Sequence, residues 1–259
     1  MKRNLVLFFQ QFHDNSKLPR GTNSSFISLI PKVDTPQSLN EYRPISLIGC
    51  MYKILAKILA LRLKVVLPYL VNERQMGFVE GMGLLQGAMV LNETLDEVRQ
   101  KKKSCMYFKV DFEKAYDLVS WTFVLYMLRR FGFQDKWIGW IGECLRTSSM
   151  SVLVNGSPTT KFSMQKLVEN KHITSPLLLR QGDPLALFLF VLVVEGLTGL
   201  VREASNSGLF RVVKVGSKGE LVNILKYADD TIFVGEASVE NVRTLKVILR
   251  GFELASGLC

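Results

Sequence analysis

The chain has 259 residues, and 48% of them are hydrophobic, so it has enough apolar material for one large domain or two modest ones. Intrinsic disorder is therefore excluded as a description of the whole chain. The 33 Lys and Arg residues against 23 Asp and Glu give a net charge of +10, which indicates a polyanionic partner. Four cysteines without a C-x-x-C pair and only 2 histidines argue against a disulfide framework and against zinc catalysis.

The first part of the chain predicts a mixture of helix and strand. Residues 3–13 indicate a short helix, and 24–32 form a β-branched and aromatic run typical of a strand. Apolar residues at helical spacing predict a helix over 46–69, whose interleaved lysines and arginines either bind an anion or form a solvated basic face. Glycines make 76–87 a turn-rich approach to a further helix that extends through Val98. The N-terminus lacks the cleavage site of a signal peptide, so we expect an intracellular protein of the nucleus or cytoplasm.

A basic run at 100–104 marks a candidate internal boundary, because strands and helices alternate after it. Helices packed on one antiparallel sheet would bury these elements economically, so the sequence predicts an α+β fold. The elements expected are a strand at 105–111, helices at 113–131 and 134–146, a hairpin at 150–165 turning at Asn155-Gly156, a helix at 185–203, two strands within 221–235 and a helix at 239–255.

Residues 185–201 are almost wholly apolar, with Glu195 as the single charge. A membrane span needs about 17 residues at the least, and a charge inside it is costly, so the segment favours a buried helix. We expect Leu187, Val191 and Val194 to be buried against the sheet, and Glu195 to be paired or near an edge.

Three acidic residues lie in apolar surroundings where strands end. Asp111 ends the strand YFKVD, and Asp229 and Asp230 lie between the two strands within 221–235. Each could be an ordinary turn residue. If the two strand ends are neighbours in one sheet, however, the three carboxylates converge into an oxygen-rich site that suits Mg²⁺. Such a site is what two-metal phosphoryl transfer requires.

Six segments of the chain together form a recognisable series of motifs: LPRGTNSSFISLIPKV (18–33), YRPISLI (42–48), QMGFVEG (75–81), FKVDFEKAYDLVSW (108–121), LRQGDPLALFLFVLVVEGL (179–197) and KYADDTIFVG (226–235). In this order they resemble the motifs of the reverse transcriptases of non-LTR (LINE-type) retrotransposons, particularly those of plants. The resemblance implies a right-hand polymerase fold, with a fingers region over 1–104 and a palm region over 105–259. It also implies RNA-directed DNA polymerase activity, with an RNA template, a DNA primer and dNTP as partners.

The resemblance also implies roles for the acidic residues and for one aromatic. Asp111 and Asp229 would be the principal ligands of two Mg²⁺ ions, for which Mn²⁺ can substitute, and Asp230 would be the third carboxylate. Tyr116 would be the steric gate that excludes a ribose 2′-hydroxyl. Without the motif context, an ordinary core aromatic of a helix is the favoured interpretation of Tyr116.

Four further residues are implied in substrate binding. Gly182 would let the backbone approach the incoming nucleotide or template, and Gln181 would contact it, although both also fit a plain entry into a helix. Either Arg43 or Lys53 could meet the triphosphate, since both residue types bind phosphate. The choice between them is open, and each also fits a plain surface role.

The sequence departs from the family pattern in several places. Residues 165–179 form a longer segment than the family has, and we expect them to form a poorly packed excursion. Met82 stands where arginine is common in the family, and Ala186 and Leu187 replace a small residue and proline. The chain ends where the family continues towards its thumb, so we expect the thumb to be absent. The alternatives are an inactive retrotransposon remnant that only binds nucleic acid, and an interaction or membrane protein. We infer no obligate protein partner.

Overall fold

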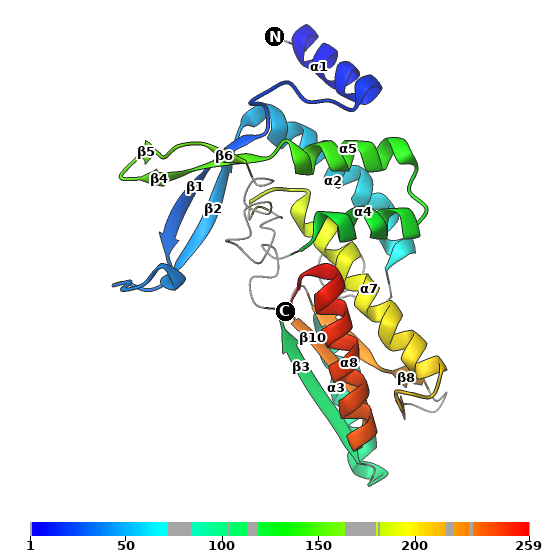
Figure 1. Cartoon of the computed structure of the whole chain (residues 1–259). Helices are drawn as coiled ribbons and strands as arrows, with labels where there is room; N and C mark the ends of the chain where they lie inside the picture. The colour runs from blue at the N-terminus through cyan, green and yellow to red at the C-terminus, as the bar shows by residue number, and fades with distance from the viewer. Residues whose placement is uncertain are drawn as a thin grey trace. The chain divides into compact units, whose positions relative to one another are not determined.

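The computed structural model describes residues 2–71, 84–102, 104–112, 119–163, 180, 182–215, 220–227 and 230–258. Figure 1 traces the chain, which divides into two compact units. The first contains Met1–Leu63 and Tyr116–Phe190, and the second contains Lys64–Ala115 and Val191–Cys259. Each unit combines residues from both sides of position 104, so the division into fingers and palm regions stays a prediction.

The first unit contains helices that each bury one apolar face. On α2, Tyr52, Leu55 and Leu59 recur at helical spacing and are almost completely buried. The elements, in chain order, are α1 Lys2–Asn15, β1 Ser24–Pro31, the 3-10 helix η1 Leu39–Glu41, β2 Tyr42–Ile48, α2 Cys50–Leu70, α4 Trp121–Arg130, α5 Asp135–Arg146, β4 Ser149–Val154, β5 Ser157–Pro158 and β6 Phe162–Ser163. The last turns of α2 belong to the second unit.

Two helices begin later than the sequence predicts. The helix expected over 46–69 begins at Cys50, because the residues before it form strand β2, which pairs with β1. The helix expected over 113–131 begins at Trp121, because Ser120 is its N-cap and accepts a hydrogen bond from the Phe123 backbone N–H at 3.4 Å. Residues 113–118 lie outside the described part. Strand pairing and capping, which apolar spacing does not reveal, thus decide both starts.

The described strands form three sheets instead of the single one that the sequence analysis expected. In the first unit, β1 lies between β2 and β4 and is antiparallel to β2 but parallel to β4. Strand β4 also pairs with β5 and β6. The turn from β4 to β5 passes through Asn155 and Gly156, with φ of 50° and 78°, which confirms the predicted hairpin.

The second unit is built around the antiparallel sheet β3-β10-β9, beside the two-stranded sheet β7-β8. Strand β10 pairs with β3 along its whole length, so the condition set by the sequence analysis, that the strand ends at Asp111 and Asp230 are neighbours in one sheet, is met. The elements are α3 Leu84–Gln100, β3 Cys105–Asp111, α7 Ala186–Asn206, β7 Val213–Val215, β8 Glu220–Val222, β9 Ile224–Tyr227, β10 Asp230–Glu236 and α8 Val239–Ser256. The first turn of α7 belongs to the first unit.

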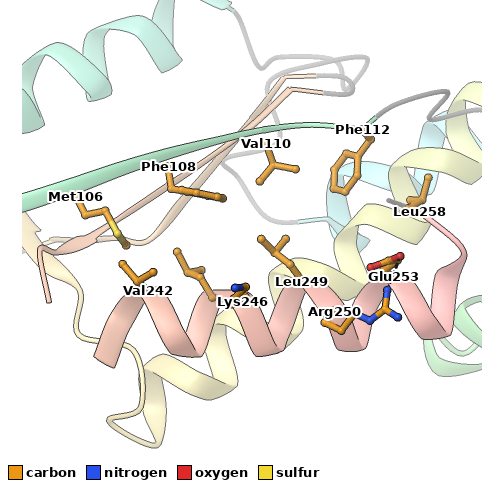
Figure 2. A pocket seen from close by; sticks show the side chains of 11 residues that line it. Met106, Phe108, Val110, Phe112, Val242, Lys246, Leu249, Arg250, Glu253 and Leu258 are labelled. Atoms are coloured by element: carbon orange, nitrogen blue, oxygen red, sulfur yellow. Dashed lines mark ion pairs between the residues drawn. The ribbon is translucent and has the colours of Figure 1, made fainter. Parts of the chain in front are cut away.

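Helices cover both faces of the β3-β10-β9 sheet. On one face, Val98 of α3 belongs to an apolar cluster that includes Val234 of β10. On the other face, Met106, Phe108 and Val110 point towards α8, and a cavity of about 590 Å³ lies between strand and helix (Figure 2). An antiparallel sheet covered by helices is the α+β arrangement that the sequence predicts.

The apolar segment 185–201 forms most of helix α7. Val191 and Val194 are fully buried, as predicted, and Glu195 is buried and paired with Lys226. Leu187 is only partly buried, unlike Leu185 and Ala186 beside it, so the prediction that it is buried is wrong. No helix in the described part of the chain has both the length and the apolar character that crossing a membrane requires.

Candidate active site

Two of the three predicted metal ligands lie opposite each other at one end of the β3–β10 pair. Asp111 is the last residue of β3, Asp230 is the first of β10, and the two are register partners. Directly opposed residues of an antiparallel pair project from the same face, with Cβ atoms about 5 Å apart. Asp111 is exposed and the Asp230 side chain is 43% exposed, so both carboxylates reach solvent.

Lys109 holds one of these carboxylates. It stands two positions before Asp111, on the same face of the sheet, and its Nζ lies 2.8 Å from Asp230 Oδ1. The ammonium group offsets the repulsion between the two facing carboxylates. Since both partners are substantially exposed, the ion pair contributes at most about 1 kcal/mol to folding.

The chemistry of this donor set suits a hard divalent cation, because Mg²⁺ and Mn²⁺ prefer carboxylate oxygens. The third predicted ligand, Asp229, lies outside the described residues, as do Tyr116 and Gln181. Within the described residues, no group of 3 or more His, Cys, Asp and Glu side chains is placed to hold a metal ion. Asp111 and Asp230 alone would therefore need at least one more ligand to hold a metal ion.

Gly182 lies where two backbone segments of the first unit approach closely. Its φ is +104°, and a Cβ built at this position would lie 3.1 Å from the carbonyl oxygen of Ser46. A backbone in the left-handed half of φ space and a tight contact both favour glycine. Ser46 belongs to the YRPISLI segment, so the structure brings two of the six recognised motifs together.

A buried network fixes the residues on either side of this glycine. Arg180 Nη2 donates to Asn23 Oδ1 at 2.5 Å and to Asp183 Oδ2 at 3.1 Å, and its guanidinium lies over the Tyr52 ring, 4.6 Å from the centroid. The Tyr52 hydroxyl donates to the same Asp183 oxygen at 3.0 Å. Burial, and then the nearby Asp183 carboxylate, raise the pKa of Tyr52 well above its usual range. The phenol therefore stays a hydrogen-bond donor.

The two basic candidates for the triphosphate also lie in the first unit. Arg43 is exposed on β2, opposite Ile30 of β1, and Lys53 is exposed in the first turn of α2. Both are accessible to an anion, and the choice between them stays open.

Sequence reasoning missed Lys109, Tyr52 and Asn23. A signal for Lys109 was available, because alternation along a strand places it on the same face as Asp111. No local signal exists for Asn23 and Tyr52, which meet their partners Arg180 and Asp183 across 157 and 131 residues respectively.

An α+β fold, a net charge of +10 and two opposed carboxylates at an accessible sheet end are features of enzymes that act on the phosphates of nucleic acids. The family model described as reverse transcriptase (RNA-dependent DNA polymerase) matches residues 30–256. The chain therefore belongs to the reverse transcriptase family, whose members are RNA-directed DNA polymerases.

Its curated relatives include retrotransposon proteins. The chain is 27% identical over 229 residues to the Pol polyprotein of a type-1 R2 retrotransposable element of Popillia japonica, which covers 88% of this chain and 29% of the relative. It is 26% identical over 224 residues to a 149 kDa protein of transposon TX1 of Xenopus laevis, covering 86% of this chain and 16% of the relative. The chain thus spans less than a third of either relative, and both support the resemblance to retrotransposon reverse transcriptases.

Solved structures show the same fold. The apo telomerase of Candida tropicalis truncated from its C-terminal domain aligns with a TM-score of 0.55 at 11% identity, covering 99% of this chain and 53% of that one. The telomerase of the same species in complex with a fragment of telomeric RNA aligns with a TM-score of 0.59 at 10% identity, covering 98% of this chain and 42% of that one. At this identity the likeness concerns the fold alone.

Proposed function

We propose that this chain carries the catalytic site of an RNA-directed DNA polymerase at the end of the β3–β10 pair, formed by Asp111, Asp229 and Asp230. The observation that carries the proposal is the direct opposition of Asp111 and Asp230 in the strand register. It places on one face two carboxylates that lie 119 residues apart in sequence, and Asp229 directly precedes Asp230 in the chain. A shared cation would neutralise these two facing charges more fully than Lys109 alone does.

In this proposal the three carboxylates hold two Mg²⁺ ions, for which Mn²⁺ can substitute. When held by these carboxylates, the ions would supply acidification of a primer 3′-hydroxyl and neutralisation of charge on the leaving pyrophosphate. The register of β3 and β10 holds the Asp111 and Asp230 carboxylates opposite each other. In the absence of the metal ion, the Lys109 ammonium would offset their negative charge. Asp229 supplies the further carboxylate that the two described ones need.

The remaining predicted residues would bind substrates. Gly182, which lies between the networked residues Arg180 and Asp183, would admit the nucleotide or template closely, with Gln181 contacting it. Tyr116 would exclude the ribose 2′-hydroxyl, and Arg43 or Lys53 would meet the triphosphate. The substrates are an RNA template, a DNA primer and dNTP, and the excess of basic residues supports such polyanionic partners.

We further propose that the chain comes from a non-LTR element of a plant, with fingers up to residue 104 and palm from 105, and that it acts inside the cell. The plant origin is supported by a mitochondrial protein of Arabidopsis thaliana that is 45% identical over 53 residues, which is 20% of this chain. Recovery of a transcript that encodes this chain from plant RNA would test this origin directly.

Primer extension on poly(rA)/oligo(dT) with Mg²⁺ tests the activity. Asp111→Asn, Asp229→Asn and Asp230→Asn should each abolish extension, because each removes a charged ligand without changing side-chain size. Glu240→Gln is the matched control, since Glu240 is an exposed acid in the first turn of α8, and it should extend like the unmodified chain. Tyr116→Ala should extend but accept ribonucleotides.

The inactive-remnant alternative gives a different result. In that case the unmodified chain would be retained by nucleic acid in a salt-dependent way without extending any primer. Extension that survives all three Asp→Asn changes would contradict the site assignment itself.

A further inference from the structure

A fully buried ion pair lies next to the candidate catalytic site. Lys226 Nζ of β9 is 2.6 Å from Glu195 Oε2 of α7, and the two side chains are 0% and 8% exposed. Burial lowers the pKa of Lys226, against the opposing effect of Glu195. Burying two charges is expensive, and an apolar pair of the same volume is often as stable or more stable. The pair therefore needs an explanation other than folding stability.

The register shows how close this pair is to the carboxylates. Lys226 is opposite Thr231, and the next residue of β9, Tyr227, is opposite Asp230. Asp230 is in turn opposite Asp111 on the neighbouring strand. The ion pair thus lies one register position from the strand ends that carry the candidate ligands.

The two groups point to opposite faces of the sheet, because side chains alternate along a strand. The carboxylates share one face with Lys109, whereas Lys226 projects from the other face, towards α7. Thr231, opposite Lys226, is 0% exposed, and its hydroxyl is among the buried polar atoms of the described residues without a hydrogen-bond partner. On this buried face, the Lys226–Glu195 ion pair therefore connects the sheet end that bears Asp230 to helix α7.

A charged hydrogen bond restricts a strand more than an apolar contact does. The apolar pattern also favours one register, and the buried 2.6 Å ion pair adds a directional contact that forms at only one position of the strand along the helix. A strand that slips by one residue turns every side chain to the other face, which would remove Asp230 from Asp111. The pair has the geometry that prevents such a slip.

We propose that Glu195 and Lys226 are positioning residues that lock the β9–β10 hairpin in the register that holds the catalytic carboxylates together. This inference rests on the proposed function of Asp111 and Asp230. It assigns to α7 the role of anchoring strand β9 beside the strand end that bears Asp230. Loss of the pair therefore weakens metal binding, even where the fold survives.

The test compares the unmodified chain with the double variant Lys226→Met/Glu195→Leu, which replaces both charges by apolar groups and leaves no buried charge unpaired. Glu195→Gln is the second variant, since it keeps a hydrogen-bond acceptor of nearly the same shape. The control is Val213→Ala, which removes buried apolar volume from the same unit at the cluster around Val98. Urea unfolding measures stability, and calorimetric titration with Mn²⁺ alone measures metal binding without any catalysis. Primer extension separates kcat from KM for dTTP.

The double variant should fold as stably as the Val213→Ala control but bind Mn²⁺ at least about tenfold more weakly. Its kcat should fall about 100-fold, because misplaced catalytic groups cost on that order, with KM changed much less. Glu195→Gln should fall between it and the unmodified chain. The control should keep the Mn²⁺ affinity.

A double variant that binds Mn²⁺ and extends primers like the unmodified chain would overturn the positioning role and leave the proposed function intact. If Asp230→Asn binds Mn²⁺ as well as the unmodified chain, the site assignment fails, and the positioning role fails with it. A purely structural pair would lower the folded fraction of the Glu195→Gln variant and leave the Mn²⁺ affinity of its folded molecules unchanged.

Discussion

Tyr52 and Asp183 lie 131 residues apart and are joined by a hydrogen bond of 3.0 Å from the phenol to the carboxylate. The bond links α2 to the loop that precedes α7. Asp183 accepts at its other oxygen from the Leu185 backbone N–H at 3.0 Å, so the same carboxylate also caps the start of α7. One acidic side chain thus fixes the loop that contains Gly182.

Tyr52→Phe should destabilise the chain by about 1 kcal/mol or somewhat more, because it removes a buried donor to a charged acceptor while keeping the ring under Arg180. Urea unfolding measures the change. Tyr126→Phe is the matched control, because the Tyr126 side chain is 50% exposed, and it should change stability by less than about 0.5 kcal/mol. Equal effects of the two substitutions would contradict the importance of the network.

The buried thiol of Cys144 should lower the free energy of unfolding at alkaline pH. Burial, and then the neighbouring Asp183, raise the pKa of this thiol far above its ordinary 9.0. The folded chain then keeps its proton while the unfolded chain loses it, so stability is fully present below pH 9.0 and falls as the pH rises further. The slope from one such group reaches about 1.4 kcal/mol per pH unit.

Cys144→Ala should therefore flatten the decline in the free energy of unfolding between about pH 9.5 and 10.5, as followed by urea titrations. Cys50→Ala is the control, because Cys50 is exposed, and it should follow the unmodified chain. The buried Tyr52, whose pKa is also raised, continues to lower stability above pH 10.0 in every variant. Parallel curves for Cys144→Ala and the unmodified chain would show that the thiol does not matter.

Gly235 of β10 is packed so tightly that no side chain fits. A Cβ at this position would lie 2.7 Å from Phe210 Cζ and 3.0 Å from both Arg211 O and Asn241 Nδ2. The last two atoms are themselves joined, since Asn241 Nδ2 donates to Arg211 O at 2.8 Å. Gly235→Ala should thus cost about 2 kcal/mol through overpacking.

Gly251→Ala is the contrasting variant, because Gly251 lies in α8 with nothing within 4 Å of a built Cβ. It should stabilise the chain by about 0.5–1 kcal/mol through helix propensity. Thermal unfolding of the two variants should therefore shift in opposite directions. A stabilised Gly235→Ala variant would contradict the close packing of β10 against Phe210.

The sequence predicted those parts of the fold that depend on local pattern. Alternation and turn residues were enough for β3, β10 and the Asn155-Gly156 hairpin, and the continuous apolar run for α7. Two helix starts were predicted too early for different reasons. The helix α2 starts late because β2 pairs with the distant strand β1, whereas α4 starts at its local cap Ser120, which the apolar spacing alone does not show. The sequence analysis expected the carboxylates to converge only if the two strand ends are neighbours. The register of β3 and β10, in which Asp111 is opposite Asp230, meets this condition.

The residues that support the candidate site could not be predicted, since their roles depend on contacts between residues distant in the sequence. Lys226 is one lysine in an apolar strand, and only its distance to Glu195, 31 residues away, shows why it is buried. Asn23 likewise shows no local sign that it binds Arg180. The predicted roles of Tyr116, Gln181 and Asp229, and the excursion expected at 165–179, lie outside the described residues.

Lys109 should oppose metal binding at the candidate site. Its ammonium lies 2.8 Å from Asp230 Oδ1, so an arriving cation meets a carboxylate that is already paired and a positive charge that repels it. Lys109→Met removes the charge and keeps an unbranched side chain on the strand. The Mn²⁺ affinity should therefore rise several-fold, equivalent to about 1 kcal/mol, while the metal-free chain becomes slightly less stable because Asp111 and Asp230 then repel each other uncompensated. Thermal unfolding with and without Mn²⁺ measures both effects, since a ligand that binds only the folded state raises its stability.

Lys101→Met is the control for this prediction. Lys101 pairs with Glu97 at the end of α3, and its loss should leave the Mn²⁺-induced shift in unfolding temperature unchanged. A weaker response to Mn²⁺ in Lys109→Met than in the unmodified chain would show instead that the lysine holds Asp230 in the orientation that the metal requires.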